Sequence, residues 1–150
     1  MRSKVMVERR MRTGKYVLCF EGEVRQVISN LINNAIDAMP PHGGRLLLRT
    51  REATDHAEDA RQLVITVADT GGGISPQAAK NLFEPFFTTK EFTGTGLGLW
   101  ISREIMTRHG GSIRVRSSQR LGRSGTVFTI ALPKDDASSS NPQFAVAEQN

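Results

Sequence analysis

The sequence of 150 residues has few of the residues on which several classes of protein depend. Its single cysteine, Cys19, excludes an intramolecular disulfide, and its apolar neighbours predict a small buried side chain. One tryptophan and one tyrosine are too few for the stacked aromatic side chains that bind single-stranded nucleic acid. No apolar run approaches the length of a membrane span, and residues 1–12 lack the apolar segment of a signal peptide. We therefore expect a cytoplasmic domain; whether its parent protein is bound to a membrane stays open.

The chain is basic, with a formal net charge of +5. A basic surface attracts nucleic acid, anionic lipid or phosphate-bearing small molecules. The arginines at positions 45, 49, 51, 114 and 116 alternate with apolar residues, as outward-facing positions of strands do. Charge alone therefore leaves the partner open, and the shortage of aromatic residues disfavours nucleic acid.

The most regular segment is residues 23–39, whose apolar side chains recur at the spacing of one helix face. The opposite stripe is rich in amides and comprises Gln26, Asn30, Asn33, Asn34 and Asp37. Asparagine is a poor helix former, and a solvated face more often carries glutamate, lysine or arginine. The stripe either contacts a hydrated cation or polar ligand or is a plain solvated face, and its composition favours the ligand.

The remaining chain alternates between segments with the period of a strand and segments with the period of a helix. Strands are expected at residues 4–10, 15–20, 45–50, 62–68, 112–117 and 126–132, the first two joined around Gly14. Helices are expected at residues 75–82 and 97–109. We interpret residues 52–60 as a polar loop, residues 84–96 as a mobile loop and residues 134–150 as a disordered tail.

The hydrophobic content of 38% is enough for one domain with its own core. Predicted strands that are neighbours in sequence and joined by short loops favour an antiparallel or mixed sheet. We therefore predict an α+β sandwich over residues 1–133, with helices on one side of the sheet. The helix side that bears the asparagines is the expected ligand surface.

The segment Asp69-Thr70-Gly71-Gly72-Gly73 directly follows a strand that we expect to be buried. One interpretation is a tight turn, for which aspartate and glycine are common residues. The other is a ligand site, in which the glycines let a ligand pack on bare backbone while the aspartate accepts a hydrogen bond from an exocyclic amine. Adenine offers such an amine. The segment alone does not decide between the two.

A glycine-rich segment leads into the predicted helix at residues 97–109. Its sequence is Gly94-Thr95-Gly96-Leu97-Gly98-Leu99. Such an entry exposes N–H groups and the positive end of the helix dipole to an anion, although a flexible hinge is the alternative. The segment is neither a Walker A loop, because no Gly-Lys-Ser/Thr follows, nor a Rossmann fingerprint, because its glycines are spaced by two. Lys90 in the same loop either adds a charge for a phosphate or is a solvated lysine.

Four segments in this order resemble the asparagine, first glycine, phenylalanine and second glycine boxes of sensor histidine kinases. They are Asn30-x-x-x-Asn34, Asp69-x-Gly71-x-Gly73, Phe83-Glu-Pro-Phe-Phe87 and Gly94-x-Gly96-x-Gly98. The last two are highly specific in combination, and the three phenylalanines look like anchors that dock a loop onto the core. The similarity covers residues 13–133. The sequence Asn-Ala-Ile-Asp-Ala-Met at residues 34–39 resembles the nitrogen-regulation branch of these kinases. The chain is thus similar to the catalytic, ATP-binding domain of these kinases, in the GHKL group that includes DNA gyrase and mismatch-repair ATPases.

The resemblance implies a Bergerat-type fold, a mixed and mostly antiparallel sheet backed by three helices, with a site for ATP and Mg²⁺. It places Asn30 near the γ-phosphate as a catalytic residue together with Lys90, and the side-chain oxygen of Asn34 on Mg²⁺. Asp69 would bind the adenine amine. The other residues assigned to the nucleotide site are Asp37, Gly71, Gly73, Phe87, Thr88, Gly94, Gly96, Leu97, Gly98, Leu99 and Thr126.

The chain departs from the family pattern at two residues, Asp37 and Trp100, and Trp100 is unexpected just after the second glycine box. Many histidine kinases carry a lysine three residues after the second asparagine, where this chain has Asp37. None of His42, His56 and His109 lies in a helix of the kind that holds a phosphate-accepting histidine, so each is expected to be structural or exposed. We therefore expect the acceptor on a separate dimerisation domain, with a response regulator as an indirect partner and this segment as a monomer.

Three functions are compatible with these residues. The first is a kinase domain that donates the γ-phosphate to that separate histidine. The second is a docking module whose nucleotide state controls its grip on a partner without phosphoryl transfer. The third, an ATPase clamp like gyrase, is disfavoured because Asn30 stands where those enzymes carry a basic glutamate, and an amide cannot take the proton.

Overall fold

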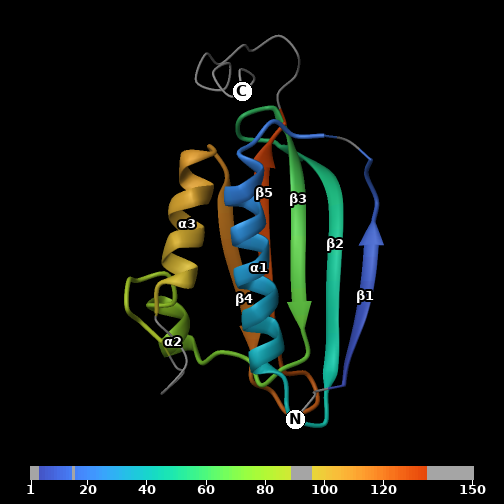
Figure 1. The fold of residues 1–150 in the computed structure, drawn as a ribbon, viewed down its shortest axis with the longest axis vertical. Helices are drawn as coiled ribbons and strands as arrows, with labels where there is room; N and C mark the ends of the chain where they lie inside the picture. The colour runs from blue at the N-terminus through green and yellow to red at the C-terminus, as the bar shows by residue number, and fades with distance from the viewer. Residues whose placement is uncertain (1–3, 15, 89–95, 135–150) are drawn as a thin grey trace.

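Five strands form one open sheet in the order β1-β2-β3-β5-β4 (Figure 1). The computed structural model describes residues 4–14, 16–88 and 96–134. The strands are β1 (Val5–Met11), β2 (Gly44–Asp55), β3 (Ala60–Asp69), β4 (Ser112–Ser118) and β5 (Gly125–Pro133). β1 runs parallel to β2, and every other pair of neighbours is antiparallel. The predicted mixed, mostly antiparallel sheet is therefore confirmed.

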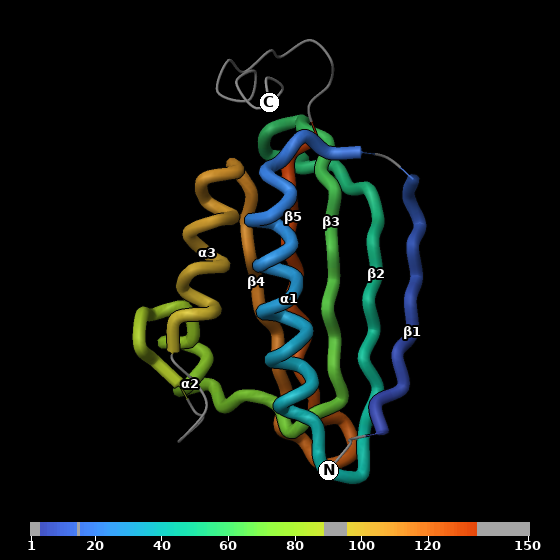
Figure 2. The backbone as a smooth tube through the Cα atoms, viewed as in Figure 1, coloured from blue at the N-terminus to red at the C-terminus, as the bar shows by residue number. Residues whose placement is uncertain are grey.

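Three helices lie on one face of this sheet. They are α1 (Glu21–Ala38), α2 (Pro76–Lys80) and α3 (Gly98–Arg108). α1 packs against α3 and β3, and α3 packs against β4, so the two long helices lie side by side (Figure 2). The predicted α+β sandwich is confirmed. In the ranges that the structure describes, no helix is long and apolar enough to cross a membrane.

The core lies between the helices and the sheet. Its helical part comprises Val24, Val27, Leu31 and Ala35 of α1 with Ile105 and Met106 of α3. Its strand part comprises Leu46, Val67, Phe128, Ile130 and Leu132. The core positions of β5 are two residues apart because successive side chains of a strand point to opposite faces. The apolar stripe predicted for residues 23–39 is thus the buried side of α1.

Two predictions about strands and loops are wrong. Residues 16–20 form no strand, because β1 pairs in parallel with β2 instead of turning back around Gly14. Residues 52–55 and 60 belong to strands instead of a loop, because β2 and β3 stay paired out to Asp55 and Ala60, and residues 56–59 form the turn between them. A β ladder is made by backbone groups, so polar side chains on an open sheet do not interrupt it. The centre of the loop predicted at residues 84–96, and the tail beyond Lys134, lie outside the described residues.

Candidate functional site

Helix α1 connects two of the segments singled out in the sequence. Near its middle, Asn30 contacts the first turn of α3, and at its C-terminal end the Ala38 carbonyl accepts a hydrogen bond from Gly72 N at 3.3 Å. These two positions of α1 are about 12 Å apart at the rise of an α-helix. The glycine loop after β3 and the N-terminus of α3 therefore lie at the two ends of one strip along α1.

Asn30 fixes the start of α3 to α1. Its half-buried side chain donates from Nδ2 to the carbonyl of Gly98 and to Ser102 Oγ, both at 3.2 Å. Ser102 is fully buried and its hydroxyl donates to the same Gly98 carbonyl at 2.8 Å. The amide stripe thus contacts protein at this position, and Ser102 is a partner that the sequence reasoning missed. Only its place four residues after Gly98 on a helix marks it in the sequence.

The N-terminus of α3 is the end of the strip that suits an anion. α3 begins after Leu97 without a side-chain cap. The first N–H groups of a helix have no partner within the helix and carry the positive end of its dipole. A Cβ on Gly98 would come only to 3.8 Å from Asn30 Cγ, an ordinary contact, so the described residues do not crowd this position.

Asp69 is the carboxylate at the other end. Its side chain is 8% exposed, and Oδ1 accepts a hydrogen bond from Gly71 N at 2.8 Å. Burial raises the pKa of this carboxyl above its ordinary value, while the backbone hydrogen bonds from Gly71 and Thr126 act in the opposite direction. The carboxylate is therefore held in one orientation by two backbone N–H groups.

The glycines after Asp69 are required by their own backbone contacts. A Cβ on Gly71 would lie 2.5 Å from the Ala38 carbonyl oxygen and 2.9 Å from Asp69 Oδ1. Gly73 has a φ of +78°, and a Cβ there would lie 2.1 Å from the carbonyl oxygen of Ser118. The loop is thus packed between the end of α1 and the end of β4. The segment is therefore a tight loop, as the first interpretation predicts, and its role as a ligand site stays a prediction.

Thr126 lies beside Asp69 in the sheet. The two residues are partners in the β3–β5 register, and Thr126 is 3% exposed. Its hydroxyl is 2.8 Å from Ser117 Oγ, which also accepts a hydrogen bond from Ile74 N at 2.7 Å. Ser117 was missed in the sequence, although it follows Val115 at the strand period and so falls on the core-facing side of β4.

The three phenylalanines of the Phe83–Phe87 segment do not behave alike. Phe83 packs against the core, as expected of an anchor, with Arg103 over its ring at 5.9 Å. Phe86 is 75% exposed, so the expectation that it anchors the loop is wrong. Instead its backbone N–H donates to the Gly96 carbonyl at 2.9 Å, and a Cβ on Gly96 would lie 2.4 Å from the Phe86 carbonyl carbon. This contact joins the residues that flank positions 89–95.

For the remaining predicted site residues, the structure gives the element and the exposure of each side chain. Asn34 is half-buried on α1, Asp37 is exposed on the next turn, Phe87 is half-buried and Thr88 is exposed. Leu97 and Leu99 are half-buried at the start of α3. Lys90 and Gly94 lie outside the described residues. Among the residues that are described, no group of three or more histidine, cysteine, aspartate or glutamate side chains is arranged to hold a metal ion.

The histidines are placed as the sequence predicted. His42 and His56 are exposed. His109 is buried, its Nε2 accepts a hydrogen bond from Phe20 N at 3.1 Å, and its Nδ1 lies 2.8 Å from the Ile105 carbonyl. This pairing requires a neutral ring that donates from Nδ1. His109 thereby joins the residue before α1 to the end of α3.

Comparison with known proteins finds relatives for most of the chain. Residues 21–136 match the family described as histidine kinase-, DNA gyrase B-, and HSP90-like ATPase. The chain is 40% identical over 117 residues to sporulation kinase E of Bacillus subtilis (strain 168), an alignment that covers 78% of this chain and 14% of that protein. The chain therefore spans only a small part of this curated relative's length.

Solved structures share the fold. The mycobacterial sensor histidine kinase MprB has a TM-score of 0.72 at 29% identity, over 86% of this chain and 81% of that one. Full-length ShkA in complex with AMPPNP also has a TM-score of 0.72, at 28% identity, over 91% of this chain and 27% of that one. AMPPNP is an analogue of ATP, so one protein of this fold was solved with such a nucleotide.

Proposed function

Because the chain belongs to the family of histidine kinase-, DNA gyrase B- and HSP90-like ATPases, we propose that it binds Mg-ATP and donates the γ-phosphate to a histidine. The acceptor would stand on a separate dimerisation domain of the same kinase, and residues 1–133 would form the catalytic domain. The observation that supports this most is the strip along α1, with a buried carboxylate at one end and a helix N-terminus at the other. A purine with an exocyclic amine and a chain of phosphates has the two complementary ends.

At the first end, Asp69 accepts a hydrogen bond from the adenine amine. The carboxylate is already oriented by Gly71 N and Thr126 N, so little freedom is lost when the base binds. Gly71 and Gly73 hold the loop in the shape that leaves this carboxylate facing the base.

At the second end, the N–H groups around Leu97, Gly98 and Leu99 hold the phosphates. Asn34 offers an amide oxygen to Mg²⁺, and Asp37 stands on the next turn of the same helix. Magnesium is usually bound through a few protein oxygens, waters and substrate phosphates, so a site without a cage of carboxylates fits it. The sequence assigns Lys90 and Gly94 to the same end.

Phosphoryl transfer requires mainly that the reacting groups are positioned and that the charge of the phosphates is neutralised. Mg²⁺ supplies this neutralisation when it is bound. Within the described part of the chain, Asn30 makes hydrogen bonds through Nδ2 alone, so its Oδ1 can accept a hydrogen bond from the attacking group and orient it without taking its proton. His109 is buried with both ring nitrogens bonded and does not suit an acceptor. His42 and His56 lie in turns and not in a helix of the kind that holds an acceptor histidine. We therefore place the acceptor on another domain, and a response regulator would take part only after that step.

The competing functions predict different products. A docking module would bind nucleotide without transferring phosphate. A gyrase-like clamp would hydrolyse ATP slowly through a general base, and Asn30 cannot serve as one.

Calorimetric titration with Mg-ADP and Mg-AMPPNP tests the nucleotide site. We expect one-to-one binding that Asp69→Asn weakens by at least about tenfold, equivalent to about 1.4 kcal/mol. Asp59→Asn is the matched control, because Asp59 is exposed in the β2–β3 turn with a φ of 49° that asparagine also adopts. Equal affinity of the two variants would exclude Asp69 as the adenine acceptor.

Incubation with a purified acceptor domain and γ-labelled ATP tests the transfer. Label on a histidine supports the kinase. Tight nucleotide binding with no label on the acceptor supports the docking module, and release of labelled phosphate by the chain alone supports the clamp.

A further inference from the structure

One face of the sheet carries no helix in the described ranges. The strand residues that face the core alternate with residues that point away from it. The register places Arg49 and Arg51 of β2, and Arg114 and Arg116 of β4, on this second side. We call these four residues the arginine face. Within the described part of the chain their side chains make no hydrogen bond or ion pair, and Arg49 Nε is shielded from water as well.

Arg51 and Arg114, two of the four residues of the arginine face, line opposite sides of a hollow and so form a trough with a basic wall on each side. β3 and β5 separate β2 from β4, so the two pairs of arginines stand about 14 Å apart at the spacing of neighbouring strands. A hollow of about 480 Å³ extends from Arg51 over the small side chains of Val64 and Ala131 to Arg114. A helix with its side chains is about 10–12 Å wide, so it fits between the walls, whereas one small anion reaches only one of them.

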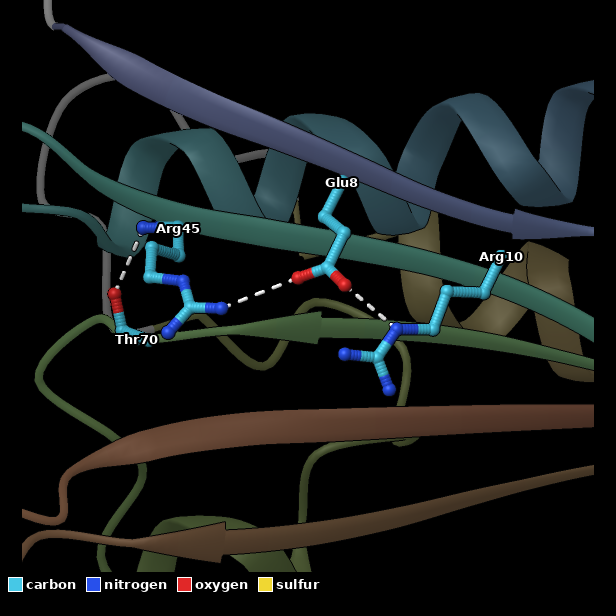
Figure 3. A network of polar contacts seen from close by, with 4 residues as sticks. All are labelled: Glu8, Arg10, Arg45 and Thr70. Atoms are coloured by element: carbon cyan, nitrogen blue, oxygen red, sulfur yellow. Dashed lines mark hydrogen bonds and ion pairs between the residues drawn. The ribbon is translucent and has the colours of Figure 1, made fainter.

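The same side of the sheet already binds a carboxylate of the chain itself. Glu8 of β1 accepts hydrogen bonds from Arg10 Nε at 2.6 Å and from Arg45 at 3.1 Å (Figure 3). The bond from Arg10 is the main reason that the pKa of Glu8 lies below its usual value. Arg10 and Arg45 therefore share one carboxylate, whereas among the described residues the four arginines of the arginine face have no acid paired with them.

The acidic residues of the trough lie at one end. Asp55 and Glu58 line the hollow at the tip of the β2–β3 hairpin. The Asp55 carboxylate is engaged there, because it accepts hydrogen bonds from Ala57 N at 2.9 Å and from Gln62 Nε2 at 3.3 Å. The acidic side chains at the hairpin tip therefore leave the two arginine walls with an excess of positive charge.

We propose that the arginine face is a docking surface for an acidic α-helix of a partner protein. Arginine pairs with carboxylates through two parallel hydrogen bonds, and glutamates on both flanks of one helix would meet both walls. The strands place no aromatic side chain on this side of the sheet, which does not suit single-stranded nucleic acid. The floor of the trough is concave, which does not suit a flat lipid surface.

Fluorescence anisotropy of a labelled, capped helical peptide of about 20 residues, built from Ala-Glu-Ala-Ala-Glu repeats, tests this surface. We expect Arg51→Gln with Arg114→Gln to weaken binding by about tenfold or more, because each lost arginine removes a charge-assisted pair. The matched control is Arg120→Gln with Arg123→Gln, which makes the same charge change in the exposed β4–β5 connection and should change binding by less than about twofold. Binding of Mg-ADP should be the same in both double variants, which shows that each is folded and keeps this test separate from the nucleotide site.

Three results would overturn the proposal. Equal loss of affinity in the two double variants would mean attraction to net charge alone. Equal binding of a peptide with two central prolines would mean that the ligand is not a helix. Stronger binding of duplex DNA or phosphatidylserine vesicles, with the same dependence on Arg51 and Arg114, would assign the surface to another class of partner.

Discussion

Replacing Gly73 by alanine should destabilise the protein, whereas the same change at Gly72 should not. Gly73 has a φ of +78°, and a Cβ there would lie 2.1 Å from the Ser118 carbonyl oxygen. Gly72 is next in the chain, has no heavy atom within 4 Å of its Cβ position and has no left-handed φ. The two variants add the same methyl group to the same loop, so their difference measures the left-handed backbone and the contact with Ser118 together.

The magnitude follows from two effects. A left-handed backbone costs an alanine about 1–2 kcal/mol relative to glycine. The contact with Ser118 involves backbone, which cannot rotate away, and relieving such an overlap costs about 1–3 kcal/mol more. Together they predict a loss of about 2–5 kcal/mol for Gly73→Ala. Gly72→Ala should be neutral or stabilising by about 0.4–1 kcal/mol, because alanine restricts the unfolded chain.

Urea unfolding followed by the fluorescence of Trp100, the single tryptophan, measures both variants. With a denaturant slope of about 2 kcal/mol/M, the midpoint of Gly73→Ala should fall by about 1–2.5 M, and that of Gly72→Ala should stay within about 0.5 M. A parallel titration with Mg-ADP shows whether nucleotide affinity changes as well. Equal midpoints for the two variants would refute the account of Gly73 as a packing position.

Other perturbations separate the parts of the site. Asn30→Ala removes the link to α3 and should lower the free energy of unfolding by about 1 kcal/mol while weakening nucleotide binding, as measured by denaturation and calorimetry. Asn34→Ala should make nucleotide binding much less dependent on Mg²⁺, and an unaltered response to EDTA would contradict that role. Burial raises the pKa of Asp69, so nucleotide affinity should fall on acidification at a higher pH than for an ordinary aspartate, and Asp69→Asn should abolish this dependence. The effect of Asp69 on stability has the opposite sign: its destabilising contribution is fully present above the folded pKa and is lost as the pH falls to the unfolded pKa. His109→Ala removes the acceptor for Phe20 N and a buried ring, and should cost about 2–4 kcal/mol in thermal unfolding.

The spacing of apolar residues predicted the helices and most strands, because the residues at that spacing are the ones buried in the core. The apolar stripe of residues 23–39 became the buried side of α1, and the alternation at residues 126–132 became the core face of β5. Periodicity failed at residues 52–60, where an open sheet accepts polar residues on a continuous backbone ladder. It also failed at residues 16–20, because nothing local indicates that β1 pairs in parallel with β2.

The sequence marks candidate site residues where a local motif contains them. Asp69 and the glycines after it carry their own turn chemistry and could be found from the sequence. Ser102 and Ser117 could not, because the role of each depends on a partner far away in the chain, Asn30 for one and Thr126 for the other. Contacts of that kind are fixed by the fold and leave little signature in a local pattern.

The glycines of the site illustrate why loss of binding and loss of structure must be measured together. Gly71 touches the end of α1, Gly73 touches the end of β4, and Gly96 touches the backbone of Phe86. Each therefore packs one segment of the candidate site against backbone of another segment, whether or not a ligand also lies against it. Gly98 is the exception, since a Cβ there meets only an ordinary contact. If Gly98→Ala weakens nucleotide binding without shifting the unfolding midpoint, the loss therefore indicates contact between Gly98 and the ligand. At Gly71, Gly73 or Gly96 the same loss of binding indicates first that the local backbone has been displaced.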